Sequence, residues 1–210
     1  MRVAILGGTG SFGRALAARL LALGEDEVVI GSRDAERAEA AAAELGANAK
    51  GAANEDAVAG VDLAVLAVKA DAALDTARAV APALGTTPLL SVASAVTFWP
   101  DGCRPDSDVR SLAERIQAVV DGPVVAGLHS IAAASLDGAP PDEDALVCGD
   151  DPAAKVLALA LAAKVVAGRA LDAGPLAGAR TLEGLTAVIV NLNRRYRAHA
   201  GISVTGIRRA

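Results

Sequence analysis

The stretch MRVAILGGTGSFGRALAARL (residues 1–20) contains a short apolar run, a glycine-rich turn and a segment with helical spacing. The apolar run Arg2–Leu6 predicts a buried strand, and Ser11–Leu23 predicts a helix. The turn between them carries the pattern GxGxxG at Gly8, Gly10 and Gly13. A strand, such a turn and a helix in this order are typical of a dinucleotide-binding unit.

The residues of the glycine-rich turn have different predicted roles. Gly8 allows the tight turn, Gly10 lets the backbone approach a pyrophosphate, and Gly13 allows close packing of helix and strand. The pyrophosphate then lies on the amides of the helix N-terminus, where the helix dipole favours an anion. Thr9 and Ser11 can add hydroxyl donors. The alternative is a purely structural glycine turn, which the surrounding strand–helix–strand pattern disfavours.

The end of the second predicted strand indicates which dinucleotide binds. NAD enzymes usually place an acidic residue there for the ribose hydroxyls, but this chain has Ser32 and Arg33 instead. Arg37 lies four residues beyond Arg33, on the same helix face, and can close over a 2′-phosphate. These residues favour NADP over NAD. The other interpretation is a solvated first helix turn, with Asp34 and Glu36 as ion partners.

Predicted strands and helices alternate along the rest of the chain. Further strands are predicted at Glu27–Ile30, Asp62–Val68, Pro88–Val92, Pro123–Gly127, Ala145–Cys148 and Arg169–Asp172. Further helices are predicted at Asp34–Leu45, Glu55–Ala59, Ala72–Ala83 (with Pro82 expected to end it), Val109–Val120, Pro152–Val166 and Arg180–Ala200. Irregular segments are predicted at Ala47–Ala53, Phe98–Gly102 and Leu128–Asp144. This alternation predicts the α/β class: a doubly wound, mostly parallel Rossmann-type sheet with a C-terminal helical extension.

Composition bounds the domain organisation. A hydrophobic fraction of 53% and a charged fraction of 21% exclude intrinsic disorder. Aromatic residues make up only 2%, so the core has to be built from Ala, Val, Leu and Ile. No shift in composition marks a second domain. We therefore expect residues 1–210 to form a single NADP-binding Rossmann-type domain, with 180–210 as the C-terminal helix and tail.

Several classes of protein are excluded. A net charge of −5 argues against nucleic-acid binding through bulk electrostatics. Cys103 and Cys148 are too few for a disulfide framework and lack the spacing of metal ligands. The apolar stretch Val156–Ala163 is too short to span a bilayer, and the N-terminus reaches glycine too soon for a signal peptide. We expect a cytoplasmic protein that binds small molecules and neither metal, nucleic acid nor membrane.

The sequence offers few candidates for acid–base chemistry. Tyr196 is followed four residues later by Ala200, which excludes the Tyr-x-x-x-Lys pair of short-chain reductases. Lys155 and Lys164 have the character of solvated helix ends. His129 follows an apolar strand at an edge where open α/β sheets bind ligands, although a structural histidine is an equally good interpretation. We expect hydride transfer by positioning of two flat rings, with no catalytic residue other than His129 as a weak candidate.

Short motifs along the whole chain carry a family resemblance. They are Met1–Gly13, Gly31–Arg33, Asp62–Val68, Asp75–Arg78, Leu128–Ile131, Val147–Asp151, Leu171–Leu176, Glu183–Thr186 and Asn191–Ile202. In these motifs the chain resembles the NADPH-dependent coenzyme F420 reductases, also called F420:NADP oxidoreductases. Members of that family transfer hydride directly between NADPH and a deazaflavin and are typically homodimers.

The resemblance implies a set of site residues. Those implied to bind NADP(H) are Gly8, Thr9, Gly10, Ser11, Phe12, Gly13, Ser32, Arg33, Arg37, Val68, Ala70, Ser94 and Ala133. Those implied to lie near the deazaflavin are His129, Ile131, Ala132, Ala200, Gly201 and Ile202. The chain departs from the family pattern at Ala70, which replaces an aromatic residue, and at Ala132, which replaces a proline. Both changes make the pocket roomier.

The C-terminal helix suggests an interface. An apolar stripe at helical spacing comprises Leu182, Leu185, Val188, Ile189 and Leu192. This stripe fits a homodimer contact and fits packing on its own domain equally well. Basic residues follow it at Arg194, Arg195, Arg197, Arg208 and Arg209. They can attract the anionic tail of F420 or form a solvated helix end.

The leading hypothesis is an NADP-dependent oxidoreductase that exchanges hydride with coenzyme F420. One alternative is an NADPH reductase for another flat or metal-chelate acceptor, such as a flavin or a ferric chelate. A second alternative is a non-catalytic NADP-binding redox sensor. Acceptor-dependent oxidation of NADPH discriminates the enzymes from the sensor.

Overall fold

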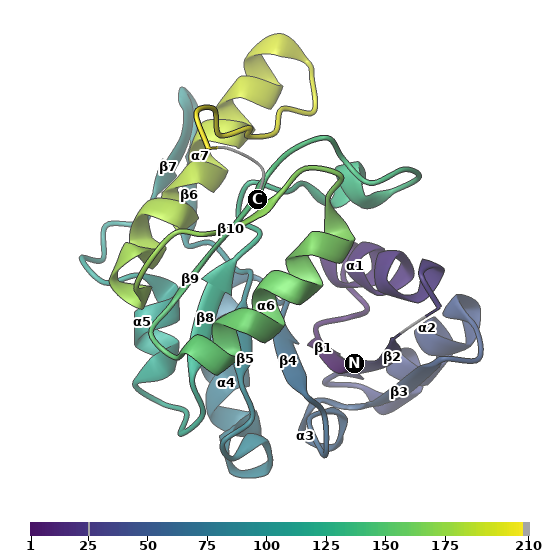
Figure 1. Ribbon diagram of the computed structural model, residues 1–210. Coiled ribbons are helices and arrows are strands. Elements are labelled where there is room, and N and C mark those ends of the chain that lie inside the picture. Colours follow the sequence, from purple (N-terminus) through teal and green to yellow (C-terminus); the bar gives the residue numbers. More distant parts are fainter. Residues whose placement is uncertain (25, 208–210) are drawn as a thin grey trace.

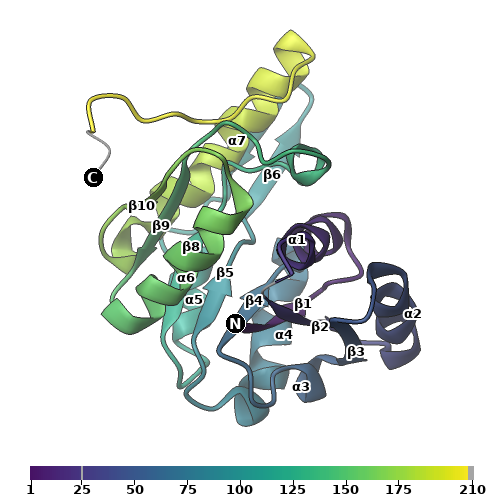
Figure 2. The same cartoon turned by 45° about the vertical axis from the view of Figure 1, so that its right-hand side comes forward.

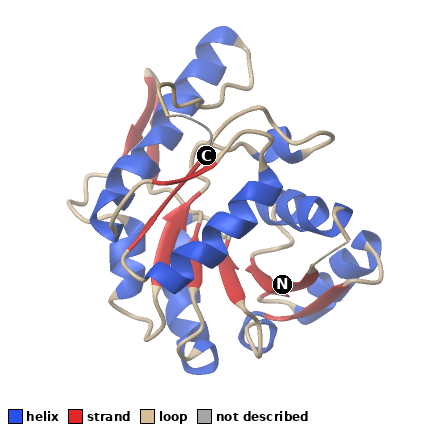
Figure 3. Ribbon diagram, in the orientation of Figure 1, coloured by secondary structure: helices blue, strands red, loops and turns tan. Residues whose placement is uncertain are grey.

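The computed structural model describes residues 1–24 and 26–207, which form a central sheet covered by helices on both faces (Figures 1 and 3). The strands of the sheet are β1 (Arg2–Leu6), β2 (Glu27–Ser32), β3 (Ala49–Ala53), β4 (Leu63–Leu66), β5 (Leu89–Ser91), β8 (Val124–Gly127), β9 (Ala145–Gly149) and β10 (Ala170–Asp172). The α-helices are α1 (Ser11–Ala22), α2 (Ala35–Leu45), α3 (Asn54–Ala57), α4 (Ala70–Leu84), α5 (Leu112–Gln117), α6 (Pro152–Val165) and α7 (Ala179–Tyr196). A separate hairpin consists of β6 (Val96–Trp99) and β7 (Gly102–Pro105).

The strand order confirms the predicted fold class. It reads β10-β9-β8-β5-β4-β1-β2-β3, and neighbouring strands are parallel except for the antiparallel pair β8 and β9. The order along the chain reverses between β1 and β4. In open α/β sheets the crevice at the carboxyl ends of two such strands is where ligands bind.

The core has two halves, one on each face of the sheet. Along β1, Val3 and Ile5 pack with α1, α2 and α6, whereas Ala4 and Leu6 pack with α3, α4, α5 and the start of α7. Figure 2 shows these two helical layers on opposite sides of the strands. Among the described residues, the fully buried apolar side chains include no aromatic residue, as the composition predicts.

Four of the predicted elements are wrong. The segment Ala47–Ala53, predicted as a loop, contains β3, where Gly51 packs directly on the backbone of α2. Phe98–Gly102, predicted as irregular, belongs to the β6–β7 hairpin, whose mostly exposed residues give no burial pattern to detect. The helix expected to end at Pro82 continues to Leu84, because a proline in the exposed last turn forfeits only one hydrogen bond. The helix predicted over Val109–Val120 is reduced to α5, whose start at Leu112 is set by the capping box of Ser111 with Glu114.

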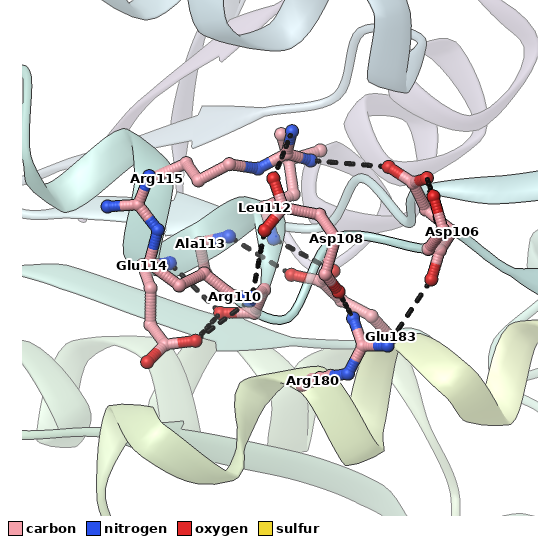
Figure 4. Close-up of polar contacts among 11 residues, drawn as sticks. Asp106, Asp108, Arg110, Leu112, Ala113, Glu114, Arg115, Arg180 and Glu183 are labelled. Atoms are coloured by element: carbon pink, nitrogen blue, oxygen red, sulfur yellow. Dashed lines mark hydrogen bonds and ion pairs between the residues drawn. The ribbon is translucent and has the colours of Figure 1, made fainter.

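Polar side chains of α7 fix this helix to the rest of the fold. The buried carboxylate of Glu183 accepts hydrogen bonds from the backbone N–H groups of Leu112 and Ala113, both at 3.0 Å, at the start of α5 (Figure 4). Burial raises the pKa of the Glu183 carboxyl. Further along, the amide of Asn191 donates to the carbonyl of Cys103 and accepts from its N–H at 2.8 and 2.7 Å. The helix is thereby tied to α5 at one end and to β7 at the other.

A search of the described residues finds no helix that combines the length and the apolar character needed to cross a membrane.

Replacing Glu183 by Gln tests the contact between α7 and α5. The Gln amide nitrogen cannot accept a hydrogen bond, so one backbone N–H of α5 loses its partner in a buried site. We expect a loss of about 1–3 kcal/mol in the free energy of unfolding, measured by urea denaturation. Glu39→Gln, at an exposed position of α2, is the control and should change it by less than about 0.5 kcal/mol. Equal stability of the two variants would contradict this role of Glu183.

Candidate functional site

The glycine-rich turn is held at the carboxyl end of β1 by unusually close backbone contacts. The N–H groups of Gly7 and Gly8 both donate to the carbonyl of Gly31, at 3.0 and 3.1 Å, at the end of β2. Gly7 has a φ of +81°, which favours glycine. A Cβ atom on Gly13 would lie 2.6 Å from the carbonyl oxygen of Gly7, so only glycine lets α1 start this close to β1.

The start of α1 can accept an anion. Gly10 is the N-cap and has no side chain with which to cap the first-turn amides. A Cβ atom at Gly10 would meet only the carbonyl of Gly7, at 3.2 Å, so the turn stays open on the side of the adjoining cavity. Free N–H groups, the helix dipole and nearby hydroxyls of Thr9 and Ser11 are the donor set that a pyrophosphate requires.

A cavity of about 1200 Å³ extends from this turn to the end of β2. The predicted residues that line it are Thr9, Gly10, Ser11, Phe12, Ser32, Arg33, Arg37 and Val68. Gly8 and Gly13 are not in its wall and act through the shape of the turn. The cavity therefore joins the proposed pyrophosphate site to the proposed 2′-phosphate site.

The end of the cavity at Ser32, the proposed 2′-phosphate site, carries the side chains of Arg33 and Arg37. Within residues 1–24 and 26–207, the guanidinium groups of Arg33 and Arg37 form no ion pair, and both side chains are exposed. Asp34 instead caps α2 by accepting from the N–H of Arg37 at 3.2 Å. The interpretation in which Asp34 and Glu36 neutralise these arginines therefore finds no support in the described contacts.

Sequence reasoning missed Asn54, which lines the same cavity at the end of β3. Its side chain is buried, and its Oδ1 atom has no hydrogen-bond partner among the described residues. The same Oδ1 would lie 2.8 Å from a Cβ atom on Gly31. Prediction of β3 would have placed Asn54 at the ligand-binding edge of the sheet.

A second cavity, of about 610 Å³, adjoins the first at the crevice between β1 and β4. Phe12, Val68, Lys69 and Asp71 line both cavities. The predicted residues of the smaller cavity are Phe12, Val68, Ala70, Ser94, His129 and Ile131. Phe98 from the hairpin and Thr186 from α7 also line it. Neither was predicted as a site residue, although Thr186 ends one of the family motifs, because tertiary contacts place both elements at the cavity.

His129 is the titratable group buried in the wall of the smaller cavity. Only 7% of the residue is exposed, and burial lowers its pKa to about 4. The imidazole is therefore neutral at physiological pH. Its Nδ1 lies 3.0 Å from Oγ of Ser94, which in turn lies 2.6 Å from Oγ1 of Thr186.

Besides Gly8 and Gly13, five predicted residues line neither cavity: Ala132, Ala133, Ala200, Gly201 and Ile202. Ala132 and Ala133 lie at the start of a 3₁₀ turn just beyond Ile131. The tail residues pack elsewhere, since the Ile202 carbonyl accepts from the N–H of Asp144 at 2.7 Å. Arg208 and Arg209 fall outside the described residues.

The arrangement suits a reaction that the protein promotes by holding two reactants in position. The walls of the smaller cavity combine apolar side chains with one neutral imidazole and two hydroxyls. Two exposed charged residues, Lys69 and Asp71, lie where the two cavities meet. Such a site can hold two flat ring systems close together and exclude water from between them.

Comparison with known proteins identifies the family of the chain. Residues 2–95 match the family described as NADP oxidoreductase, coenzyme F420-dependent. The chain is 36% identical to the F420-dependent NADP reductase of Methanothermobacter marburgensis, with 99% of each chain covered. It is 32% identical to that of Methanocaldococcus jannaschii, again with 99% of each covered.

A solved structure is similar in fold. It is a protein from Arthrobacter sp. FB24 proposed to be an F420-dependent NADP reductase, with a TM-score of 0.83 and 27% identity over 98% of this chain and 100% of that one. Because the sequence similarity to the two archaeal reductases spans nearly the whole of each chain, this protein belongs to the family of F420-dependent NADP reductases, which are oxidoreductases.

Proposed function

We propose that this protein transfers a hydride directly between NADP(H) and the deazaflavin coenzyme F420. The observation that carries the proposal is the pair of adjoining cavities that share Phe12, Val68, Lys69 and Asp71. One cavity leads to the glycine-rich turn, and the other, of about 610 Å³, has mostly apolar walls and is large enough to hold a ring system. Family membership supplies the identity of the second cofactor.

The residues of the chain bind and orient the two cofactors. NADPH supplies the hydride, and the deazaflavin ring of F420 accepts it. The first-turn amides of α1 hold the pyrophosphate, and Ser32, Arg33 and Arg37 hold the 2′-phosphate. Val68 and Ala70 border the nicotinamide, and His129 and Ile131 line the space for the second ring.

The first experiment is a spectrophotometric assay of the purified protein with NADPH and oxidised F420. We expect loss of the deazaflavin absorbance with NADPH and far slower loss with NADH. Turnover of a flavin or a ferric chelate in place of F420 would overturn the choice of acceptor. Tight NADPH binding without turnover of any acceptor would indicate a sensor.

Arg33→Ala tests the 2′-phosphate site. The substitution removes a charge-assisted contact of about 1.5–3 kcal/mol, so the dissociation constant for NADPH should rise by about 10- to 150-fold. The constant for NADH should change by less than about threefold, because NADH lacks this phosphate. Arg110→Ala removes an exposed arginine that lines neither cavity and serves as the control in the same fluorescence titration. Equal weakening of both cofactors would contradict the assignment of Arg33.

We also propose that the protein is a homodimer and that residues 1–210 form one domain, with 180–210 as its C-terminal helix and tail. The apolar stripe of α7 is divided: Leu182 and Ile189 are buried within the subunit, whereas Val188 is 52% and Leu192 38% exposed. Val188, Leu192 and Tyr196 follow one another at intervals of four residues, so these exposed side chains share one face of α7. Because α7 packs beside the β6–β7 hairpin (Figure 1), this apolar face is supported by the fold and available to a second copy.

Val188→Glu places a charge on the proposed dimer face. We expect the dimer to dissociate to a monomer of about half the mass in light scattering coupled to size-exclusion chromatography, because a buried unpaired charge is costly. Val156→Glu is the matched control, since Val156 is 65% exposed on α6, away from this face. A Val188→Glu protein that keeps the dimer mass would place the interface elsewhere.

A further inference from the structure

Three side chains from three different elements form one hydrogen-bonded chain in the wall of the smaller cavity. Ser94 follows β5, His129 follows β8, and Thr186 lies in α7. Oγ of Ser94 is 3.0 Å from Nδ1 of His129 and 2.6 Å from Oγ1 of Thr186. Oγ1 of Thr186 also lies 2.8 Å from the backbone carbonyl oxygen of His129. This series of hydrogen bonds thus begins at the ring of His129 and ends at the backbone carbonyl of the same residue.

The donor and the acceptor of each of these three hydrogen bonds can be assigned by counting protons. A carbonyl oxygen can only accept, so the Thr186 hydroxyl donates its single proton to the carbonyl of His129. Oγ1 of Thr186 must then accept from the Ser94 hydroxyl, which uses the proton of Ser94. Oγ of Ser94 is left as an acceptor, so Nδ1 of His129 carries the proton that bonds to it. The assignment follows from the fixed acceptor at one end.

The other ring nitrogen is therefore a hydrogen-bond acceptor. In the neutral Nδ1–H tautomer, Nε2 carries a lone pair and no proton. Nε2 is buried and has no partner among the described residues, although His129 lines the cavity. A buried acceptor without a partner is uncommon and calls for an explanation, and a ligand group in this cavity supplies one.

The backbone just before His129 has an uncommon conformation. Leu128, directly before His129, has a φ of +65°, although it is a buried leucine. A residue with a side chain adopts the left-handed region at a cost and does so mostly where the surrounding structure imposes it. The next residue is His129. Thr186 contacts its backbone carbonyl and Ser94 contacts its imidazole, so both its backbone and its side chain are held in place.

We propose that Ser94 and Thr186 are positioning residues that hold His129 as the Nδ1–H tautomer, so that Nε2 accepts a hydrogen bond from an N–H group on a ring bound in the smaller cavity. This inference rests on the proposed function and adds to it a basis for selecting which ligand binds in the smaller cavity. A ring that presents a carbonyl oxygen at this point meets a lone pair and is disfavoured. An amide-type N–H occurs both on the nicotinamide carboxamide and on the deazaflavin ring, so the experiment has to distinguish them.

The first test is ¹⁵N NMR of the histidine ring nitrogens at pH 7, on the protein alone. Wild type should show Nδ1 protonated and Nε2 unprotonated. In Thr186→Val the Ser94 hydroxyl loses its acceptor and turns to donate to Nδ1, which shifts His129 to the Nε2–H tautomer. Thr186→Ser keeps the hydroxyl and should retain the wild-type pattern. An Nε2–H tautomer in wild type, or no change in Thr186→Val, overturns the proposal.

The second test compares binding and turnover of the same variants. Thr186→Val should raise the dissociation constant of NADPH or the KM for F420 by about tenfold, according to which ring supplies the N–H, and leave the other within about twofold. If NADPH is affected, its acetylpyridine analogue, which lacks the amide N–H, should be insensitive to the substitution. Thr186→Ser should restore wild-type values.

The two tests separate this inference from the proposed function. Absence of F420 turnover in wild type would contradict the proposed function, whereas the tautomer and the NADPH titration would still decide the role of Ser94 and Thr186. Equal weakening of both cofactors in Thr186→Val, without rescue by Thr186→Ser, would mean that Thr186 only stabilises the fold. Ser94→Ala, which removes the acceptor for Nδ1–H, should give a mixture of tautomers and the same selective loss.

Discussion

At Gly13 the backbone of α1 comes so close to the turn at Gly7 and Gly8 that a single methyl group would not fit. This approach sets where α1 begins, and with it the direction of its free amides. Hydrogen bonds from the N–H groups of Gly7 and Gly8 to the carbonyl of Gly31 tie the turn to the end of β2. The amides proposed to bind the pyrophosphate and the residues proposed to bind the 2′-phosphate therefore share one frame. The larger cavity owes its length to this frame, because its two ends belong to neighbouring strands of the same sheet.

The C-terminal helix completes the second half of the site from a distance in sequence. Within α7, Glu183 contacts α5, Thr186 contacts His129, and Asn191 contacts β7. The outer two contacts fix the position of the helix, and the middle one delivers a hydroxyl to the cavity wall. A helix that reads as an amphipathic extension thus serves as a wall of the site. Its apolar residues divide between the core of the subunit and the exposed face.

The grouping of the proposed NADP-binding residues at one cavity was predictable because its determinants are local. The glycine spacing, the strand before it and the basic residues after β2 lie within residues 1–37, and the structure brings them to one cavity. The alternation of strands and helices likewise predicted the sheet. Phe98 and Asn54 were not predicted, because β3 and the hairpin carry no periodic apolar pattern. Thr186 belongs to one of the family motifs, but its place at the cavity was not predicted because α7 reaches it only through tertiary contacts. Single polar residues on such elements resemble any exposed side chain.

Aromatic residues are scarce in this protein, and the core consists of aliphatic side chains. The few aromatic residues that exist include two neighbours on the hairpin, Phe98 and Trp99. Trp99 is the one tryptophan in the chain, and half of it is exposed beside Phe98, which lines the smaller cavity. The guanidinium of Arg104 lies over its ring at 5.4 Å. Its fluorescence therefore comes from a single known place, one residue along β6 from a side chain of the cavity wall. The molecule carries an intrinsic optical probe whose emission overlaps the absorption of a reduced nicotinamide, and no other indole contributes to the signal.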